Sequence, residues 1–380
     1  MILDKKHEMQ RKLFRQFAET EFTKEIQDEL DETGEFNWDM HKKMARYGFM
    51  GVKIPKEYGG AGADSLTYAL MVEELARVDA VLSIYANTSN SLGGGPLLLG
   101  GNEAQKQKYL PAVASGEKIM VFGLTEPGAG SDAGGTTTTA IADGDDFIIN
   151  GRKCFISGAP MADWAVVFAK TDLTAKGSKG ISMFVVDMKL PGVSLGAHEK
   201  KMGIRGSSTC DLIFEDCIVP KENLLGKEGK GFKIAMQTLD GGRIGIASQA
   251  LGLGEGAVNE AIKYTQERVQ FGKRLSQFQN TQFQLADMHC RMQAAQYLVY
   301  AAAMKKQLHE DYSMDASMAK LFAAEAASDV TRRAVQLFGG YGYTREYPVE
   351  RMMRDAKITE IYEGTSEVQR MVISSHLGVK

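Results

Sequence analysis

The hydrophobic pattern of this 380-residue chain changes twice, and these changes limit the folds that it can adopt. Residues 119–215 hold short apolar or β-branched runs that alternate with turn residues, without helical periodicity between them. The dipeptides Gly144-Asp145 and Asn150-Gly151 are typical of hairpin turns. This region is therefore predicted to form an antiparallel β domain, either a sandwich or a small barrel.

The N-terminal flank of the β region carries helical periodicity. Met9, Leu13 and Phe17 recur at helical spacing among charged residues, which predicts an amphipathic helix with these side chains on its buried face. A helix over 103–109 is expected to end at Pro111, because proline removes a backbone donor. The N-terminal third is thus predicted to be entirely helical.

The C-terminal flank is helical as well. The pattern predicts a long helix over 236–262 that is interrupted at 240–243, followed by helices over 276–308 and 315–337. Long helices joined by short links form antiparallel bundles. Gly241 and Gly242 inside the first helix cost about 1 kcal/mol each relative to alanine, so another group is expected to pack closely there. The expected domains are 1–118, helical; 119–226, β; and 227–380, a helical bundle.

Charge and composition exclude several classes of protein. A net charge of -3 without a basic run argues against nucleic acid or an anionic membrane as the main partner. No run of about 18 apolar residues is present, and the charged N-terminus does not resemble a signal peptide. The four cysteines lack CxxC spacing, so neither a metal site nor a disulfide framework is expected. These features predict a cytoplasmic, bacterial protein.

The stretch at 354–370 has the most unusual local sequence. Glu363 stands between Tyr362 and Gly364, and Thr365 follows with a hydroxyl suited to a helix N-cap. A glycine after the glutamate suggests that the backbone approaches another group closely. The alternative interpretation is a surface turn with a solvated glutamate, since charged residues are mostly exposed.

Two glycine-rich segments are further candidates. The segment LTEPGAGSD at 124–132 could direct backbone N–H groups at a phosphate, but it is not GxGxxG, and a plain loop is the alternative. Gly93, Gly94 and Gly95 form either a plain loop or a place where absent side chains leave room for a ligand tail.

Four segments taken in order carry a resemblance to a known family. They are LTEPGAGSD at 124–132, ERVQFGK at 267–273, QLFGGYG at 336–342 and IYEGT at 361–365. Together they resemble the signatures of flavin-dependent acyl-CoA dehydrogenases, and the likeness is closest to the short-chain, butyryl-CoA type of anaerobic bacteria. The resemblance covers essentially the whole chain. It implies an α-helical N-domain, an antiparallel β middle domain and a C-terminal four-helix bundle, assembled as a homotetramer.

The resemblance also implies a chemistry. In the family, FAD accepts the β-hydrogen of an acyl-CoA as hydride, while a carboxylate at the position of Glu363 removes the α-proton. Electron-transfer flavoprotein is the implied partner, and enoyl-CoA reduction is the implied physiological direction. Gly242 stands where other members place an alternative base, which again favours Glu363. A carboxylate that is desolvated between an acyl chain and a flavin is expected to have a raised pKa.

The resemblance assigns further residues one by one. The cofactor residues are Phe122, Leu124, Thr125, Gly130, Ser131, Phe155, Ser157, Arg268, Phe271, Gln279, Gln336, Gly339, Gly340, Thr365 and Glu367. The substrate residues are Ser131, Asp240, Arg243, Tyr362 and Gly364. Arg268, Phe271 and Gln279, together with Gln336, Gly339 and Gly340, match positions where a neighbouring protomer completes the FAD site. Glu367 departs from the family, in which many members have glutamine or asparagine.

Three other hypotheses stay open. If the glycines at 93–95 deepen the acyl pocket, the substrate is an aryl-acryloyl thioester and the protein is a cinnamoyl-type reductase of the same fold. An acyl-CoA oxidase would pass its electrons to oxygen. A non-catalytic acyl-CoA-binding flavoprotein would bind its ligand without turnover.

Overall fold

The computed structural model describes residues 3–379. Its N-terminal part is helical, as predicted. The helices are α1 (Lys5–Glu21), α2 (Lys24–Thr33), α3 (Trp38–Arg46), α4 (Ser65–Val78), α5 (Ala80–Thr88), α6 (Gly94–Gly100) and α7 (Glu103–Ser115). In α1 the buried face is formed by Phe14, Phe17 and Ala18, whereas Met9 and Leu13 are 71% and 50% exposed. The predicted helix is thus correct, but two of its three predicted core residues are wrong.

Two predicted breaks in the N-terminal helices are also wrong. Helix α7 continues through Pro111 to Ser115. The glycines at 93–95 form no loop, because a π-helical turn over Ser89–Gly93 leads directly into α6. A Cβ on Gly93 would lie 2.6 Å from the Met120 carbonyl oxygen, and one on Gly94 would lie 2.9 Å from the Ser89 carbonyl oxygen. These glycines therefore let protein backbone pack closely, and they leave no room for a ligand tail.

The middle of the chain forms a seven-stranded sheet with the order β1-β4-β2-β3-β7-β6, and β5 pairs with β4. The strands are β1 (Met120–Gly123), β2 (Thr139–Asp143), β3 (Asp146–Ser157), β4 (Trp164–Lys170), β5 (Ile181–Asp187), β6 (Val193–Leu195) and β7 (Thr209–Pro220). Most pairs are antiparallel, as expected, but β4 pairs in parallel with β1 and, at one residue, with β2. Strand β3 runs opposite to β2, and the chain reverses again before β4 begins. Strand β4 therefore runs in the same direction as β1.

One of the two predicted hairpin turns is correct. Gly144 and Asp145 connect β2 to β3, where Asp143 pairs with Asp146. Asn150-Gly151 instead lies inside β3, next to a register shift against β7. Gly151 has φ 147°, and a Cβ there would press on the Thr138 side chain and backbone. This glycine therefore marks a bulge and not a turn.

The C-terminal part is again helical. Its elements are α8 (Gly231–Glu267), the hairpin β8 (Val269–Gln270) and β9 (Lys273–Arg274), α9 (Gln279–Gln307), α10 (Ser313–Phe338), α11 (Val349–Ile358) and α12 (Ser366–His376). Helix α8 runs without interruption through 240–243, so the predicted break is wrong. The close packing expected at its two glycines is present, because Gly241 faces the Lys306 side chain and Gly242 faces Glu363.

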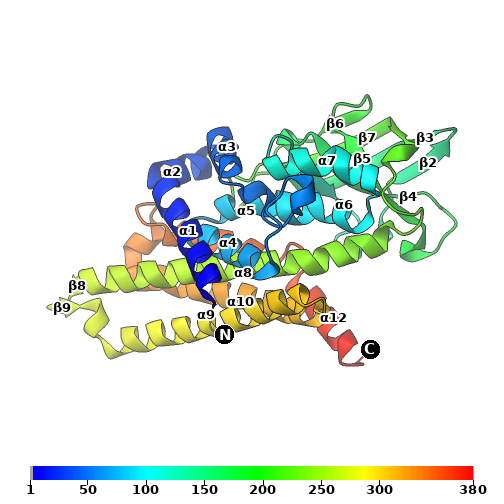
Figure 1. Ribbon diagram of the computed structural model, residues 1–380. Coiled ribbons are helices and arrows are strands. Elements are labelled where there is room, and N and C mark those ends of the chain that lie inside the picture. Colours follow the sequence, from blue (N-terminus) through cyan, green and yellow to red (C-terminus); the bar gives the residue numbers. More distant parts are fainter. Residues whose placement is uncertain (1–2, 380) are drawn as a thin grey trace.

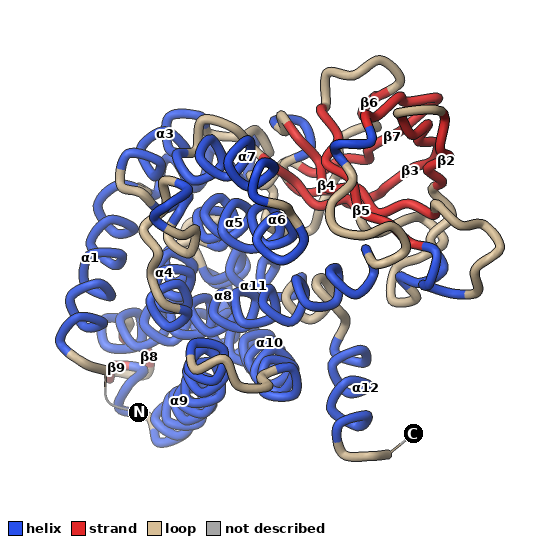
Figure 2. The backbone as a smooth tube through the Cα atoms, turned by 45° about the vertical axis from the view of Figure 1, so that its right-hand side comes forward, coloured by secondary structure: helices blue, strands red, loops and turns tan. Residues whose placement is uncertain are grey.

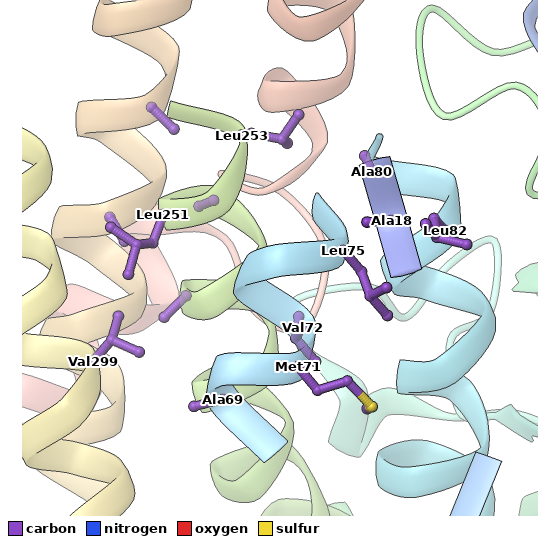
Figure 3. Packing of buried hydrophobic residues seen from close by; sticks show 14 of the residues in the cluster. Ala18, Ala69, Met71, Val72, Leu75, Ala80, Leu82, Leu251, Leu253 and Val299 are labelled. Atoms are coloured by element: carbon purple, nitrogen blue, oxygen red, sulfur yellow. The ribbon is translucent and has the colours of Figure 1, made fainter. Parts of the chain in front are cut away.

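The sheet and the helices form two adjoining bodies (Figures 1 and 2). The long helices α8, α9 and α10 run side by side, and the N-terminal end of α8 reaches the sheet (Figure 1). The largest core cluster joins α1, α4 and α5 to α8, α9 and α10, and Figure 3 shows Leu75, Leu251 and Val299 within it. A second cluster packs α6, α7 and the start of α8 against β4 and β5. Within 3–379, no helix is both long enough and apolar enough to cross a membrane.

Candidate active site

A cavity of about 700 Å³ lies where the sheet meets the helices, and it brings together residues from all three parts of the chain. The predicted site residues that line it are Phe122, Leu124, Thr125, Gly130, Ser131, Phe155, Ser157, Arg243, Tyr362, Glu363 and Gly364. Cavities of this size are typical of sites for small molecules and cofactors.

Glu363 reaches the cavity from the short link between α11 and α12. Its φ is 53° and that of Gly364 is 95°, so two successive residues adopt left-handed conformations. A Cβ on Gly364 would lie 2.7 Å from Gln369 Nε2, so the group that approaches this glycine is the chain's own Gln369. Thr365 caps α12 as predicted, because its hydroxyl accepts a hydrogen bond from the Val368 N–H. The turn is thus held in a strained backbone conformation of the kind found at functional sites.

Burial raises the pKa of Glu363 to about 7, and the positive charges of Lys320, Arg243 and Lys53 partly offset this rise. Its Oε2 atom is buried and has no hydrogen-bond partner among the described residues. A buried carboxylate without a partner is costly when it is ionised. The side chain can therefore take up or release a proton near neutral pH, as a general acid or base must.

Gly242 explains how this carboxylate fits against α8. A Cβ at residue 242 would collide with Glu363 Oε2 and would lie 3.3 Å from Ser91 Oγ. Alanine or any larger residue would therefore displace the carboxylate. Because Gly242 has no side chain, the Glu363 carboxylate can lie directly against the backbone of α8.

A buried ion pair anchors the glycine-rich loop at 124–132. Glu126 accepts hydrogen bonds from Lys153 Nζ at 2.7 Å and from the backbone N–H groups of Thr137 and Thr138 at 2.6 and 2.9 Å. Lys153 and these hydrogen bonds hold the pKa of Glu126 well below its usual range, despite its burial. Farther along the loop, Cβ atoms on Gly128 and Gly130 would meet nothing within 4 Å, so the backbone there is open to a ligand.

Phe155 and Ser157 come from the end of β3. Phe155 has φ 59° and lies at the second register shift of that strand. Its ring is 66% exposed, although it belongs to a sheet with a buried core. The bulge turns the ring out of the core and into the cavity, and a flat ligand can therefore stack on it.

Several other predicted site residues lie elsewhere. Arg268, Gln336, Gly339 and Gly340 line a cavity of about 620 Å³ at the β8–β9 end of the bundle, far from the sheet in Figure 1. Phe271 is 94% exposed at the tip of that hairpin, and Gln279 is exposed at the start of α9.

The remaining predicted residues lie close to the main cavity without lining it. Glu367 is exposed in the first turn of α12. Asp240 accepts hydrogen bonds from Arg243 at 2.6 Å and from Ser313 at 3.1 Å, and it lines a neighbouring chamber.

Two residues of the site, Lys320 and Gln249, are not among those predicted from the sequence. Lys320 Nζ donates a hydrogen bond to the Gly364 carbonyl oxygen at 2.6 Å, and its charge acts on Glu363. The Tyr362 hydroxyl donates to Gln249 Oε1. A signal for Lys320 existed in the sequence, because this lysine stands among alanines on the apolar face of α10.

Comparison with known proteins assigns all three parts of the chain to the same family. Profiles described as the N-terminal, middle and C-terminal domains of acyl-CoA dehydrogenase match residues 4–117, 121–217 and 229–378. The chain therefore belongs to the acyl-CoA dehydrogenase family, as the resemblance of its motifs predicted.

Individual relatives are similar over nearly their whole length. The short-chain specific acyl-CoA dehydrogenase of Clostridium acetobutylicum is 55% identical, with 99% of this chain and 98% of the relative covered. The caffeyl-CoA reductase-Etf complex subunit CarC of Acetobacterium woodii is 53% identical, with 99% of both covered. The structure of butyryl-CoA dehydrogenase from Megasphaera elsdenii superimposes with a TM-score of 0.96 at 47% identity, with 99% of both chains covered.

Proposed function

We propose that this protein is an FAD-dependent enzyme that removes hydrogen from the α and β carbons of a short-chain or small acyl-CoA. The physiological direction is the reverse, enoyl-CoA reduction, with electrons exchanged with electron-transfer flavoprotein. The observation that carries the proposal is that the half-buried Glu363 side chain, whose Oε2 atom is buried and whose pKa is raised to about 7, lines the same cavity as the open glycine-rich loop and the exposed Phe155 ring.

The residues around the main cavity fit FAD. Open backbone at Gly130 suits a diphosphate, and the Phe155 ring and Ser157 hydroxyl suit one face of a flat ring system. When bound there, the flavin supplies an acceptor or donor of hydride at N5. On this proposal, Thr125, Ser131 and Phe122 belong to the same cofactor site.

The chain's own groups carry out the proton transfer. In dehydrogenation the ionised Glu363 removes the α-proton, which a thioester carbonyl makes acidic when it accepts hydrogen bonds. The backbone N–H of Glu363 is the proposed donor of one such bond. In reduction the protonated Glu363 returns the proton to the α-carbon. A pKa of about 7 leaves both forms populated at neutral pH.

The second group of predicted residues supports assembly as a homotetramer. Arg268, Gln336 and Phe271 lie at an exposed end of the bundle, so we propose that they complete the FAD site of a neighbouring protomer. The proposal also keeps the domain boundaries at 118/119 and 226/227 and a cytoplasmic location.

An aryl-acryloyl thioester is the second candidate substrate. The 53% identity to the caffeyl-CoA reductase subunit favours it. The glycines at 93–95 do not favour an aryl-acryloyl substrate, because protein atoms fill the space beside them. Choosing between the two candidates thus requires a comparison of substrates.

The test is a turnover screen of the FAD-loaded protein with butyryl-CoA, crotonyl-CoA and cinnamoyl-CoA, with artificial electron acceptors and donors. We expect butyryl-CoA to bleach the flavin without release of peroxide, and Glu363→Gln to keep FAD and ligand but lose turnover. Glu360→Gln, one turn earlier in the chain, is the matched control and should stay active. If none of the three thioesters reduces or reoxidises the flavin, the proposal is refuted in favour of a non-catalytic flavoprotein, and rapid peroxide release would identify an oxidase.

A further inference from the structure

The main cavity continues beyond Glu363 into the helices. Along α8 its lining runs from Phe232 to Ile246, which is about 21 Å of helix. The N-terminal end of α8 reaches the sheet, so the Phe232 end of the cavity lies on the side of the glycine-rich loop (Figure 1). Glu363 Oε2 lies against Gly242, between these two ends. A thioester whose CoA part lies toward the sheet therefore extends its acyl group past Glu363 toward Ile246.

The part of the cavity near Ile246, which we call the acyl end, is mainly apolar. Its lining residues are Ile84, Asn87, Thr88, Leu92 and Ile246, and none of them carries a charge. The Thr88 hydroxyl donates a hydrogen bond to the Ile84 carbonyl oxygen at 2.9 Å, so its proton is already used. The acyl end is thus shaped for an uncharged group, and Asn87 is the residue whose polar atoms remain to be explained.

Asn87 uses only one end of its side-chain amide. The Tyr68 hydroxyl donates a hydrogen bond to Asn87 Oδ1. Burial and the nearby Glu363 raise the pKa of Tyr68, so this hydroxyl keeps the proton that it donates. Among residues 3–379, Asn87 Nδ2 forms no hydrogen bond, and it is not one of the fully enclosed atoms. The side chain is only 6% exposed and lines the cavity, so the free NH₂ group faces the cavity.

A glycine of α8 places this amide relative to Glu363. A Cβ on Gly245 would collide with the Tyr68 hydroxyl and would lie 2.9 Å from Asn87 Oδ1. Gly245 is three residues after Gly242, so the two positions share a face of the helix and are separated by about 4.5 Å along its axis. The amide therefore lies about one helical turn beyond the carboxylate, where an atom a few bonds past the β-carbon of an acyl group would lie.

The free NH₂ group gives the acyl end a chemical preference. A donor that is left unpaired when a ligand displaces water costs binding energy, whereas an acceptor on the ligand restores the hydrogen bond. Sites for small molecules commonly fix their ligand with a few polar groups in an apolar lining. The backbone at Asn87 is also unusual, because α5 leads directly into the π-helical turn over Ser89–Gly93, and such turns are frequent at functional sites.

We propose that Asn87 selects acyl-CoA thioesters whose acyl group carries a neutral oxygen atom a few bonds beyond the β-carbon. Asn87 Nδ2 donates a hydrogen bond to this oxygen, which belongs to an ether or a hydroxyl group on an aliphatic chain or on an aromatic ring. Asn87 takes no part in the transfer of the proton or the hydride, so it determines specificity only. This inference rests on the proposed function and names its substrate class.

The test compares two pairs of thioesters in which oxygen replaces a carbon of similar size. The first pair is 4-methoxybutanoyl-CoA and hexanoyl-CoA, and the second is 3-(4-hydroxyphenyl)propanoyl-CoA and 3-(4-methylphenyl)propanoyl-CoA. Dissociation constants are measured by calorimetry on the FAD-loaded Glu363→Gln protein, and kcat/KM of flavin reduction is measured with Glu363 intact. We expect the oxygen-bearing member of one pair to be preferred about tenfold in both measurements. The pair that shows the preference tells whether the oxygen belongs to an aliphatic or an aromatic acyl group.

Variants assign the preference to Asn87. Asn87→Leu should reduce it to less than twofold by weakening the oxygen-bearing ligand and not the hydrocarbon. Asn223→Leu is the matched control and should keep the preference, because Asn223 also accepts a hydrogen bond from a tyrosine, Tyr109, at 3.2 Å, but neither residue lines the main cavity. If Asn87→Leu fails to fold, Tyr68→Phe combined with Asn87→Leu leaves no unpaired hydroxyl, and the same loss is expected.

Other outcomes overturn the inference. Equal binding within both pairs would refute it, and so would a preference that survives the loss of Asn87. Equal weakening of both members of a pair in Asn87→Leu would mean that this residue only shapes the cavity. Failure of the proposed function gives a different result: no thioester would reduce the flavin, while the calorimetric preference for the oxygen-bearing ligand would remain.

Discussion

Replacing Lys320 with methionine should shift the pH dependence of the reaction, because this lysine is the first of the charges that oppose the burial of Glu363. Lys320 is completely buried and has a pKa of about 8, so it is mainly charged at pH 7. Loss of an opposite charge at close range raises a carboxyl pKa by about 1–3 units. We take about 1.5 units, or about 2 kcal/mol, which would move the pKa of Glu363 from about 7 to roughly 8.5.

The sign of the effect depends on the direction of the reaction. Dehydrogenation needs the ionised carboxylate, whose fraction at pH 7 would fall from about one half to roughly 3%, so the rate should fall about fifteenfold. The rate should recover as the pH rises above 9. Reduction needs the protonated carboxyl group, so the variant should stay active to a pH about 1.5 units higher than the unaltered protein.

The turn that carries Glu363 should survive this substitution. The Gly364 carbonyl oxygen also accepts a hydrogen bond from Gln369 Nε2 at 2.8 Å, and this bond remains when Lys320 is lost. The assay is the rate of flavin reduction by butyryl-CoA from pH 6 to 9.5, with Lys305→Met as the control. Lys305 lies at the end of the neighbouring helix and pairs with Asp315. A uniform loss of rate with an unmoved midpoint would refute the electrostatic argument and would leave Lys320 a purely structural role.

Two further substitutions test the packing of the site. Gly242→Ala should abolish turnover while the protein stays folded, because the added Cβ collides with Glu363 Oε2; Gly95→Ala, whose Cβ would lie 3.4 Å from Thr238, is the control and should keep full activity. An active Gly242→Ala protein would contradict this placement of the carboxylate. Lys153→Met should lower the free energy of unfolding by about 3–5 kcal/mol in urea titrations, because it leaves the Glu126 carboxylate buried without its cation. Adding Glu126→Gln should restore part of that loss, and no recovery would mean that the lysine acts through packing alone.

Local pattern was enough to predict most helices and strands of this chain. An apolar repeat of 3.6 or 2 residues shows that one side of a helix or strand is buried, and this repeat does not depend on where the element lies in the tertiary structure. It identified the helical flanks, the β region and the N-cap at Thr365. The motifs also identified the family, and the resemblance to that family, not the local stretch at 354–370 alone, predicted Glu363 as the base.

Local sequence pattern gave wrong predictions for residues whose burial or backbone conformation depends on contacts with a distant part of the chain. Leu13 and Phe14 are adjacent and both apolar, and only the packing of α1 on α4 determines that Phe14 is buried. Asn150-Gly151 has the composition of a turn, but the Thr138 backbone lies against Gly151 and makes it a bulge.

The sequence by itself determined the succession of elements, the family and the carboxylate at Glu363. The tertiary structure alone decided the electrostatic environment of that carboxylate, because Lys53 and Lys320 approach it from elements more than 40 residues away in the chain. A pKa depends on burial and on the distances to charges, and neither quantity is encoded in the spacing of residues along a single segment. The fold therefore sets how readily Glu363 gains and loses a proton, while the sequence sets only that a proton-accepting group stands there.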